Sequence, residues 1–377
     1  MTGNDKSSTH PPLPPTTEED TVKLLRLLRS RRVGVATYYR LLAEYGSAAD
    51  ALSALPQIAK AAGVSDYAIC PEGVVLAELK AGKAAGARLL IAGTPDYPKS
   101  LVQISDAPPM LWALGDISLL QRQMIALVGA RNASSLGTRM AKRLAEELSQ
   151  QGYAVVSGLA RGIDAAAHLG ALAHGTIAVQ AGGVDVIYPA ENTQLAHDIA
   201  KSGLRLSEMP MGLQPQARHF PVRNRIISGL SQAVVVVEAA AKSGSLITAR
   251  NALDQARDVL AVPGHPFDAR ASGCNMLIRD GATLVRNAAD ILETQRPVVD
   301  LEPALFTSEP QTKPRTLRDT ATLHTEIMAR LGPAPIAEDQ LLRDIKASPM
   351  DMGAVLVDLE LDGKITRQAG GLLARAV

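Results

Sequence analysis

Short apolar segments that alternate with helical segments dominate the middle of the chain, between residues 124 and 282. The apolar segments are MIALVGA, YAVVS, TIAVQ, LRLSE, AVVVVEA and DVLAVPG. Regular alternation of such strands with helices is typical of parallel βαβ units. An apolar run without polar interruption, such as AVVVV, fits a strand that is buried on both faces. The sequence therefore predicts an α/β fold with a doubly wound parallel sheet.

The segments between these strands have the apolar spacing of amphipathic helices. In the first of them Met140, Leu144 and Leu148 share one face, and Gly152 follows where a helix is expected to end. We expect helices over residues 138–151, 163–174, 194–201, 223–230, 245–256 and 275–279.

Composition changes on both sides of this region and divides the chain into five predicted segments. They are a disordered tail rich in Ser, Thr and Pro (1–18), a helical domain (19–84), the α/β domain (85–292), a proline-rich linker (293–318) and a winged-helix-like domain (319–377). The helical domain resembles a sterile-alpha-motif or helix-hairpin-helix module, although a plain helical packing domain fits equally well. Residues 88–119 are expected to supply an edge strand of the sheet.

The N-terminal sequence, the apolar runs, the cysteines and the net charge indicate where the protein is located but not which ligand it binds. The N-terminus contains acids and lacks the apolar core of a signal peptide, and no run approaches the roughly 18 apolar residues of a membrane helix. Cys70 and Cys274 have no metal-binding spacing. We expect a cytoplasmic protein without metal or cofactor. The net charge of +1 is uninformative, because binding to phosphates depends on local clusters of bases.

The loops that follow the predicted strands combine glycine, serine and basic residues. Ligands of open parallel sheets bind beyond the carboxyl ends of the strands, where helix N-termini offer free N–H groups to phosphates. The candidate binding residues in these loops are Gly129, Arg131, Ser134, Ser157, Gly158, Arg161, Gly162, Lys242, Ser243 and Gly244.

Familiar nucleotide and hydrolase motifs do not occur in these loops. Gly129 and Gly137 lie eight residues apart, and the second strand ends in Ser157 rather than in the acid of a dinucleotide site. Neither a P-loop GxxxxGK[ST] motif nor a GxSxG elbow is present. Asp164 and His168, spaced four apart on one helix, fit a structural pair better than a catalytic one.

A basic stretch points to a phosphate backbone as the ligand. Residues 215–250 contain five Lys and Arg against one acid, Glu238, which is a local excess of +4. Phe220 lies among the arginines of HFPVRNR. Aromatic rings between bases allow stacking on single-stranded nucleic acid, but Phe220 fits a core position equally well.

Long ordered motifs resemble the DprA/Smf (DNA-processing protein A) family: VGARNASSLG, SGLARGIDAAAHLGAL, GGVDVIYPAEN, HFPVRNRIISGLS, EAAAKSGSLITAR and CNMLIRDGA. The resemblance implies an extended Rossmann-like domain, a homodimer, no enzymatic activity, and binding of single-stranded DNA. It further implies protection of incoming DNA and loading of the RecA recombinase during natural transformation. Residues that match positions in or beside the family's basic pocket are Arg131, Arg161, Phe220, Arg223, Asn224, Arg225 and Lys242.

Three questions stay open at this stage. The loop after IYP reads Ala190-Glu191-Asn192, where the family often has a base, so that contact is doubtful. A nucleotide hydrolase of the cytokinin-activating type would use the same crevice, with Glu238 and Asp185 as acid and base, although its PGGxGTxxE signature is missing. The C-terminal domain carries both charges, so a protein-binding role fits it as well as a DNA-binding one.

Overall fold

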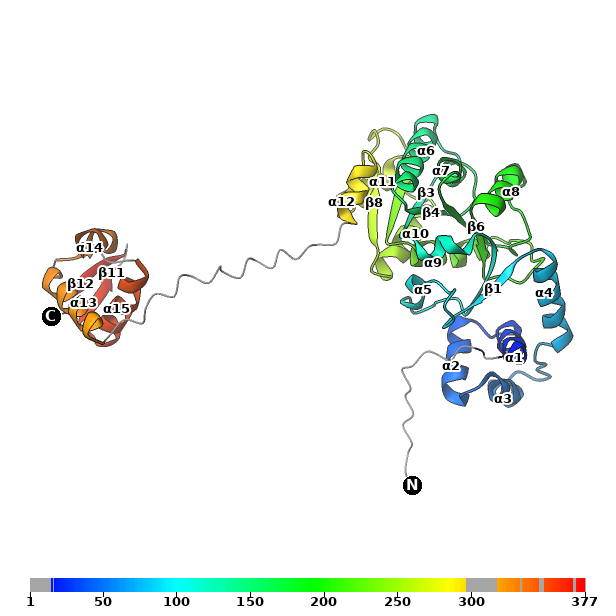
Figure 1. Cartoon of the computed structure of the whole chain (residues 1–377), viewed down its shortest axis with the longest axis horizontal. Helices are drawn as coiled ribbons and strands as arrows, with labels where there is room; N and C mark the ends of the chain where they lie inside the picture. The colour runs from blue at the N-terminus through cyan, green and yellow to red at the C-terminus, as the bar shows by residue number, and fades with distance from the viewer. Residues whose placement is uncertain are drawn as a thin grey trace, which may run out of the picture. The chain divides into compact units, whose positions relative to one another are not determined.

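The structure is a computed structural model, shown in Figure 1. It describes residue 15, residues 17–295 and residues 317–376, except positions 333, 346–348, 369 and 370. The chain divides into two compact units, Met1–Arg296 and Pro297–Val377, which we describe separately. The predicted tail and linker lie almost wholly outside the described residues.

Four helices open the first unit, as the sequence predicts for its helical domain. They are α1 (Glu18–Arg29), α2 (Val35–Tyr45), α3 (Ala48–Ala61) and α4 (Glu72–Ala84). Thr17 and Asp20 form a reciprocal capping box that sets the start of α1, and the Ser47 side chain caps α3. Their inward leucines pack with Ile91 and Met110 from the first two strands, so the helices lie against one end of the sheet.

A nine-stranded sheet forms the centre of this unit, in the order β1-β2-β6-β5-β4-β3-β7-β8-β9. Its strands are β1 (Arg88–Ile91), β2 (Met110–Gly115), β3 (Met124–Gly129), β4 (Ala154–Ser157), β5 (Thr176–Val179), β6 (Leu204–Ser207), β7 (Ala233–Glu238), β8 (Asp258–Ala261) and β9 (Thr283–Leu284). The ladders from β6 to β9 are parallel, whereas β2 runs antiparallel to both β1 and β6. The predicted doubly wound sheet is confirmed. The stretch 88–119 contributes two strands, and β9 was not predicted.

Helices cover both faces of the sheet. On one face lie α6 (Ser135–Gln150), α7 (Ile163–Ala171), α8 (Thr193–Ser202) and α12 (Ala288–Thr294), and on the other α5 (Lys99–Val102), α9 (His219–Leu230), α10 (Ser245–Asp254) and α11 (Ser272–Arg279). The side chains of β3 alternate between the two faces. Ile125 and Leu127 pack in the core under the first group of helices, and Ala126 and Val128 pack in the core under the second group.

Three helices begin three or four residues before their predicted starts, and one of them is α11, which begins at Ser272 rather than at residue 275. α6 begins at Ser135 rather than at residue 138, because the Ser134 hydroxyl accepts from the N–H of Gly137 and caps the helix. α9 begins at His219 rather than at residue 223, because Pro221 sits in its first turn, where no N–H is needed. Phe220 therefore lies on a helix.

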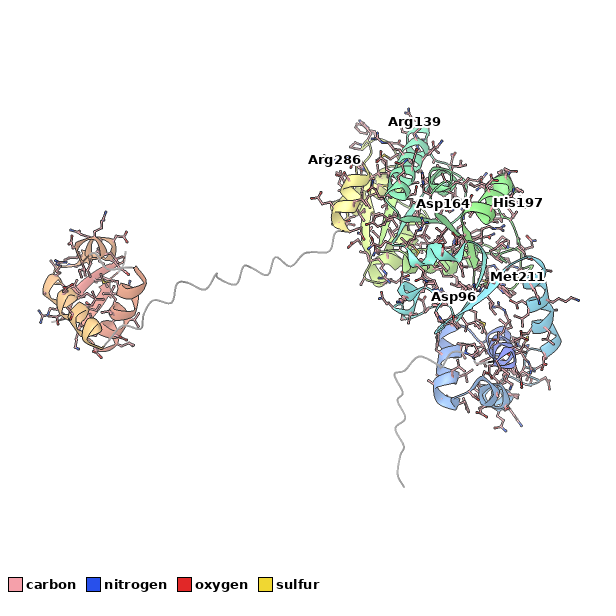
Figure 2. All side chains as sticks on the ribbon, viewed as in Figure 1. Asp96, Arg139, Asp164, His197, Met211 and Arg286 are labelled. Atoms are coloured by element: carbon pink, nitrogen blue, oxygen red, sulfur yellow. The ribbon has the colours of Figure 1, made fainter. Side chains whose placement is uncertain are left out.

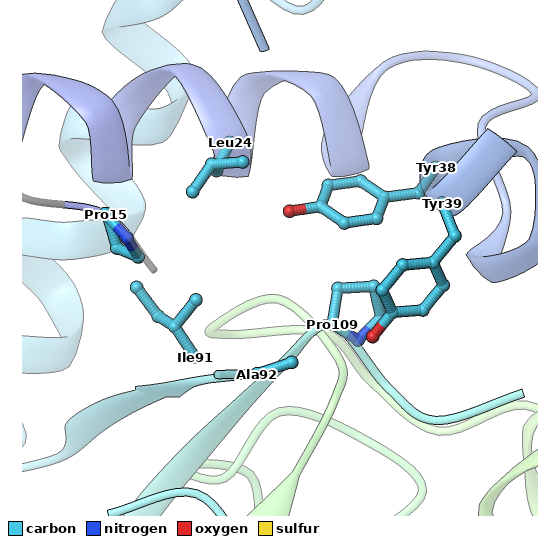
Figure 3. Close-up of a pocket in the computed structure, with 7 residues that line it drawn as sticks. All are labelled: Pro15, Leu24, Tyr38, Tyr39, Ile91, Ala92 and Pro109. Atoms are coloured by element: carbon cyan, nitrogen blue, oxygen red, sulfur yellow. The ribbon is translucent and has the colours of Figure 1, made fainter. Parts of the chain in front are cut away.

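A buried charge network joins the helical domain to the sheet. The guanidinium of Arg29 donates to both carboxylate oxygens of Glu78, and the indole N–H of Trp112 donates to the same carboxylate at 2.8 Å. A small cavity lies between α1, α2 and β1 (Figure 3). Its lining is apolar except for two tyrosines, and burial raises the pKa of Tyr39 to about 12. The cavity therefore offers little that would hold a polar ligand.

The second unit has a winged-helix arrangement. Its elements are α13 (Leu317–Arg330), β10 (Ile336–Ala337), α14 (Glu338–Ile345), α15 (Pro349–Leu361), β11 (Ile365–Gln368) and β12 (Leu372–Arg375). β12 pairs with β11 as the predicted wing, and β10 adds a third strand that was not predicted. Ile327, Leu341 and Leu356 are at most 1% exposed and form its core.

Candidate nucleic-acid interface

The loop that follows β4, residues 158–162 (the β4 loop), is held in place by side chains of α7. Asp164 lies on α7 and is labelled in Figure 2. Its carboxylate accepts from the amides of Gly158 and Ala160, at 3.1 and 3.3 Å. The ring of His168 accepts from the N–H of Leu159 at 3.3 Å. Burial raises the pKa of Asp164 and lowers that of His168 to about 3. The pair therefore holds the loop, as the structural interpretation of its spacing predicts.

Arg223 on α9 fixes the same loop from the other side. Its guanidinium donates to the carbonyl oxygen of Gly158 at 2.6 Å and also to that of Val179 at the end of β5. A Cβ on Gly158 would lie 2.5 and 2.6 Å from its two terminal nitrogens and would displace the guanidinium from this position. Burial lowers the pKa of Arg223 to about 10, a value at which it still carries its charge near neutral pH.

The loop after β3, residues 130–134 (the β3 loop), is tied to the end of β7. Glu238 accepts a hydrogen bond from the N–H of Ser134 at 2.9 Å and another from its hydroxyl. Gly162, with a φ of +76°, lets the β4 loop approach: a Cβ there would fall against the carbonyl oxygens of Ala130 and Arg131. The two loops therefore form one rigid edge at the carboxyl ends of the strands.

Arg131 and two aromatic rings meet above this edge. The Arg131 guanidinium carbon lies 4.9 Å from the centre of the Phe220 ring, within the range of a cation–π contact. The ring of Tyr188, 48% exposed, lies 5.7 Å from that of Phe220 with a tilt of 51°. Below them is a small hollow, lined by Gly158, Gln180, Ala181, Gly182, Val186, Tyr188, Pro215 and Phe220. We call these three side chains and the hollow the aromatic pocket.

Further cations lie around the aromatic pocket on neighbouring loops. Arg161 is exposed and pairs with Glu191 at 3.6 Å. Glu191 belongs to the loop after IYP, where the family often has a base, and it partly neutralises the charge of Arg161. Lys242 is exposed in the loop after β7, residues 239–244 (the β7 loop). Ser243 bonds to Ser245 at 2.8 Å, and Gly244 is exposed at the start of α10. In the part of the chain that the structure describes, Arg131 and Lys242 make no ion pair.

Three of the predicted contact residues face the protein interior. Arg223 is 4% exposed and Arg225 is 8% exposed, and both use internal acceptors. Arg225 pairs with Glu208 at 2.6 Å and with Asp106 at 3.2 Å. The Ser157 hydroxyl is fully buried and donates to a carbonyl oxygen of β3. In this structure the side chains of Arg223, Arg225 and Ser157 are thus bonded to acceptors of the protein itself, and their contact with DNA stays a prediction.

The remaining predicted residues lie at the edge itself. Gly129 ends β3, and Asn224 is half-buried on α9, where it accepts from Arg223 at 3.3 Å. Phe220 is half-buried: its ring packs against that of Tyr188, and stacking of a base on it stays a prediction.

The two carboxylates considered for acid–base chemistry are engaged with loop amides. Glu238 holds the β3 loop, and Asp185 accepts from the N–H of Gly212 with both oxygens, at 2.9 and 3.0 Å.

Among the described residues, no cluster of His, Cys, Asp and Glu is arranged to hold a metal ion. No described helix is long and apolar enough to cross a membrane. The edge thus offers cations, aromatic faces and amides, which suit a phosphate chain with bases.

Sequence reasoning missed two aromatic residues at this edge. Tyr188 lies in the loop after β5, and Phe267 lies in the loop after β8 with 94% of its surface exposed. A signal was available for both, because the chain has only seven Tyr and three Phe, and each of these two follows a predicted strand.

Three family models match successive parts of the chain. The DprA-like N-terminal HHH domain matches residues 18–81, DNA recombination-mediator protein A matches residues 88–296, and the DprA winged helix domain matches residues 311–371. The chain is 46% identical over 218 residues to the DNA processing protein DprA of Bacillus subtilis, covering 57% of this chain and 73% of that protein.

Two solved structures are similar to the chain. The X-ray structure of DNA processing protein A from Streptococcus pneumoniae has a TM-score of 0.62 and 36% identity, covering 72% of this chain and 96% of that one. DNA processing protein A from Helicobacter pylori has a TM-score of 0.52 and 31% identity, covering 55% and 95%. The latter structure was described for its single-stranded DNA binding mode.

Proposed function

The chain belongs to the DNA recombination-mediator protein A family, and from this premise we propose that it binds single-stranded DNA at the aromatic pocket and the loops around it. The observation that carries the proposal is the Arg131–Phe220 contact, at 4.9 Å, on the exposed edge of the sheet. A cation and an aromatic face side by side match the two chemical parts of a nucleotide, its phosphate and its base.

In the proposed mechanism Arg131 neutralises a phosphate while a base stacks on Phe220 or Tyr188. Amides of the β3 and β7 loops, near the starts of α6 and α10, donate hydrogen bonds to neighbouring phosphates. Arg161 and Lys242 add charge on either side. None of these contacts reads the edge of a base, so binding is expected to be nearly independent of sequence.

The interior residues serve the proposed site indirectly. Arg223, Asp164 and His168 keep the β4 loop in one conformation, so little entropy is lost when DNA binds. A preorganised edge of this kind suits a binding protein, and we propose that the chain is not an enzyme.

The family supports a wider role. We propose that the protein works in the cytoplasm as a homodimer, protects incoming single-stranded DNA from nucleases and loads the RecA recombinase onto it during natural transformation. These activities rest on the family resemblance rather than on any contact described above.

A binding comparison tests the proposal. The dissociation constants of the full chain for a single-stranded thymidine oligonucleotide and for a duplex of equal length are measured by fluorescence anisotropy at two salt concentrations. The single strand is expected to bind more tightly, and its affinity is expected to fall steeply with salt as counterions are released. Equal affinity for the duplex, or an affinity that salt does not change, would argue against the proposal.

A further inference from the structure

Phe267 is the most exposed of the large hydrophobic residues that the structure describes. Its side chain, 94% exposed, lies in the loop between β8 and α11, residues 262–271 (the β8 loop). Because β8 is parallel to β7 and β3, this loop leaves the sheet at the same edge as the aromatic pocket. A ring this exposed at the edge where the proposed ligand binds is accessible for stacking by a base.

The loop holds this ring in a defined place. Gly264 and Asn275 exchange two hydrogen bonds, at 3.0 and 3.1 Å, which close the base of the loop. The N–H of Phe267 donates to the His265 ring at 3.3 Å, and the two rings lie 5.5 Å apart. Asp268 accepts from the backbone and side chain of Arg270. The exposed ring therefore stands on an ordered turn that several bonds stabilise.

Hydrogen bonds link the neighbouring loops at this edge, either directly or through the first turn of the helix that follows a loop. The N–H of Ile163 donates to Ala130, joining the β4 loop to the β3 loop at 3.2 Å. The N–H of Ala130 donates to the carbonyl of Glu238 at the end of β7 (2.7 Å). The N–H of Gly273 donates to Ala239, joining α11 to the β7 loop at 2.8 Å. We call these four loops the loop rim.

The rim is long enough for several nucleotides and carries positive charge between its aromatic ends. From β4 to β8 there are three strand spacings, on the order of 14 Å in all, against ~3.4 Å for each base of a DNA strand. Arg131 and Lys242 lie along it without an acidic partner among the described residues. Asp268, the next residue along the chain from Phe267, is already paired with Arg270 at 3.2 Å. Its carboxylate is therefore at least partly neutralised where a polyanion would approach the ring.

We propose that Phe267 is a second base-stacking contact, so that one DNA strand runs along the loop rim from the Arg131–Phe220 pair to the Phe267–His265 pair. This inference rests on the proposed function, because it concerns the path of the same ligand. The inference specifies the path of the DNA strand along the site. The strand crosses the ends of β4, β3, β7 and β8 in that order, with its phosphates toward Arg131 and Lys242.

Phe267→Ala is the direct test, with Leu253→Ala as a matched control. Leu253 is also an exposed apolar residue, 61% exposed, but it lies near the C-terminal end of α10, away from the rim. Affinities are measured for a thymidine oligonucleotide of about 20 nucleotides and for an abasic oligonucleotide of equal length. Stacking predicts that Phe267→Ala weakens thymidine binding by about 5- to 100-fold and leaves abasic binding unchanged.

A second variant reads the contact directly. The chain has one tryptophan, Trp112, which is buried, so Phe267→Trp adds an exposed indole whose emission a stacked base quenches. Quenching by the thymidine oligonucleotide and not by the abasic one is the expected result.

The outcomes separate this inference from the function beneath it. Suppose that the wild type binds thymidine oligonucleotides and that Phe220→Ala weakens this binding, but that Phe267→Ala and Leu253→Ala both bind as the wild type does. The proposed stacking contact of Phe267 is then wrong, and the proposed function stands. If the wild type does not bind single strands, the function itself fails. If Phe267→Ala instead lowers the sedimentation coefficient without DNA, the ring contacts a second copy of the chain and the inference is overturned.

Discussion

Arg223 donates a hydrogen bond from its buried guanidinium to the carbonyl oxygen of Gly158, at 2.6 Å, and so closes the β4 loop against α9. Arg223→Met fills similar space but leaves that carbonyl and the one of Val179 unpaired and removes the charge near Asp164. We expect the free energy of unfolding to fall by about 3–5 kcal/mol, measured by urea denaturation of the full chain. The exposed Arg131→Met is the control and should change stability by less than about 0.5 kcal/mol. Equal effects of the two would contradict the assignment.

His168 makes stability depend on pH. Burial, and secondly the charge of Arg223, lower its pKa to about 3, below its ordinary value of 6.5. A depressed pKa means that the folded state binds fewer protons than the unfolded one. The contribution is therefore complete above pH 6.5 and is lost as pH falls from there toward 3. Between pH 7.5 and 5.5 the wild type should lose about 1.4 kcal/mol more than His168→Gln. Parallel pH profiles in urea denaturation would refute this.

Glu208 and Arg225 form a buried ion pair beside α9, at 2.6 Å. One oxygen of Glu208 and one nitrogen of Arg225 have no hydrogen-bond partner, so the pair depends strongly on its own contact. Removing either partner alone, as Glu208→Leu or Arg225→Met, leaves a buried charge without that partner and should cost about 3–5 kcal/mol. The double variant should cost less than the sum, with a coupling of about 1–3 kcal/mol in denaturant. Additive effects would show that the pair contributes little.

Variants of Glu238 distinguish a DNA-binding site from a nucleotide hydrolase. Because it accepts from the N–H and hydroxyl of Ser134, Glu238→Ala should lower stability by about 1–3 kcal/mol and loosen the β3 loop. The affinity for thymidine oligonucleotides should drop with it, whereas Glu238→Gln, which still accepts a hydrogen bond, should bind nearly as wild type. The parallel check is incubation with nucleoside monophosphates followed by chromatography. Turnover by the wild type that Glu238→Gln abolishes would favour the hydrolase alternative.

The sequence was sufficient to predict the parallel core but less so its margins. Strands such as β7 and β3 are uninterrupted apolar runs, and that pattern has few other solutions. β9 has only two residues, too few for an alternation or an apolar run to mark it as a strand. The start of α9 was missed because Pro221 looks like a helix breaker until its place in the first turn is known. The domain boundaries after residues 18, 84, 292 and 318 stay predictions.

The candidate site shows a different limit. Composition identified a basic, glycine-rich edge, and Arg131 and Phe220 do meet there. It did not separate Arg223 and Arg225, which face inward, from the exposed Arg161, because a sequence pattern does not distinguish an arginine that binds carbonyl oxygens from one that is free for phosphate. Tertiary packing decides that difference, and only the folded chain reveals it.

The central claim, that Arg131 neutralises a phosphate of single-stranded DNA, is tested most directly by the salt dependence of binding. The dissociation constant for a thymidine oligonucleotide is measured over a range of salt concentrations for the wild type and for Arg131→Ala. Loss of one phosphate contact should weaken binding about 10- to 100-fold and reduce the slope of log affinity against log salt by about 0.7, while the melting temperature stays unchanged. An Arg131→Ala protein with the affinity and the slope of the wild type would contradict the account.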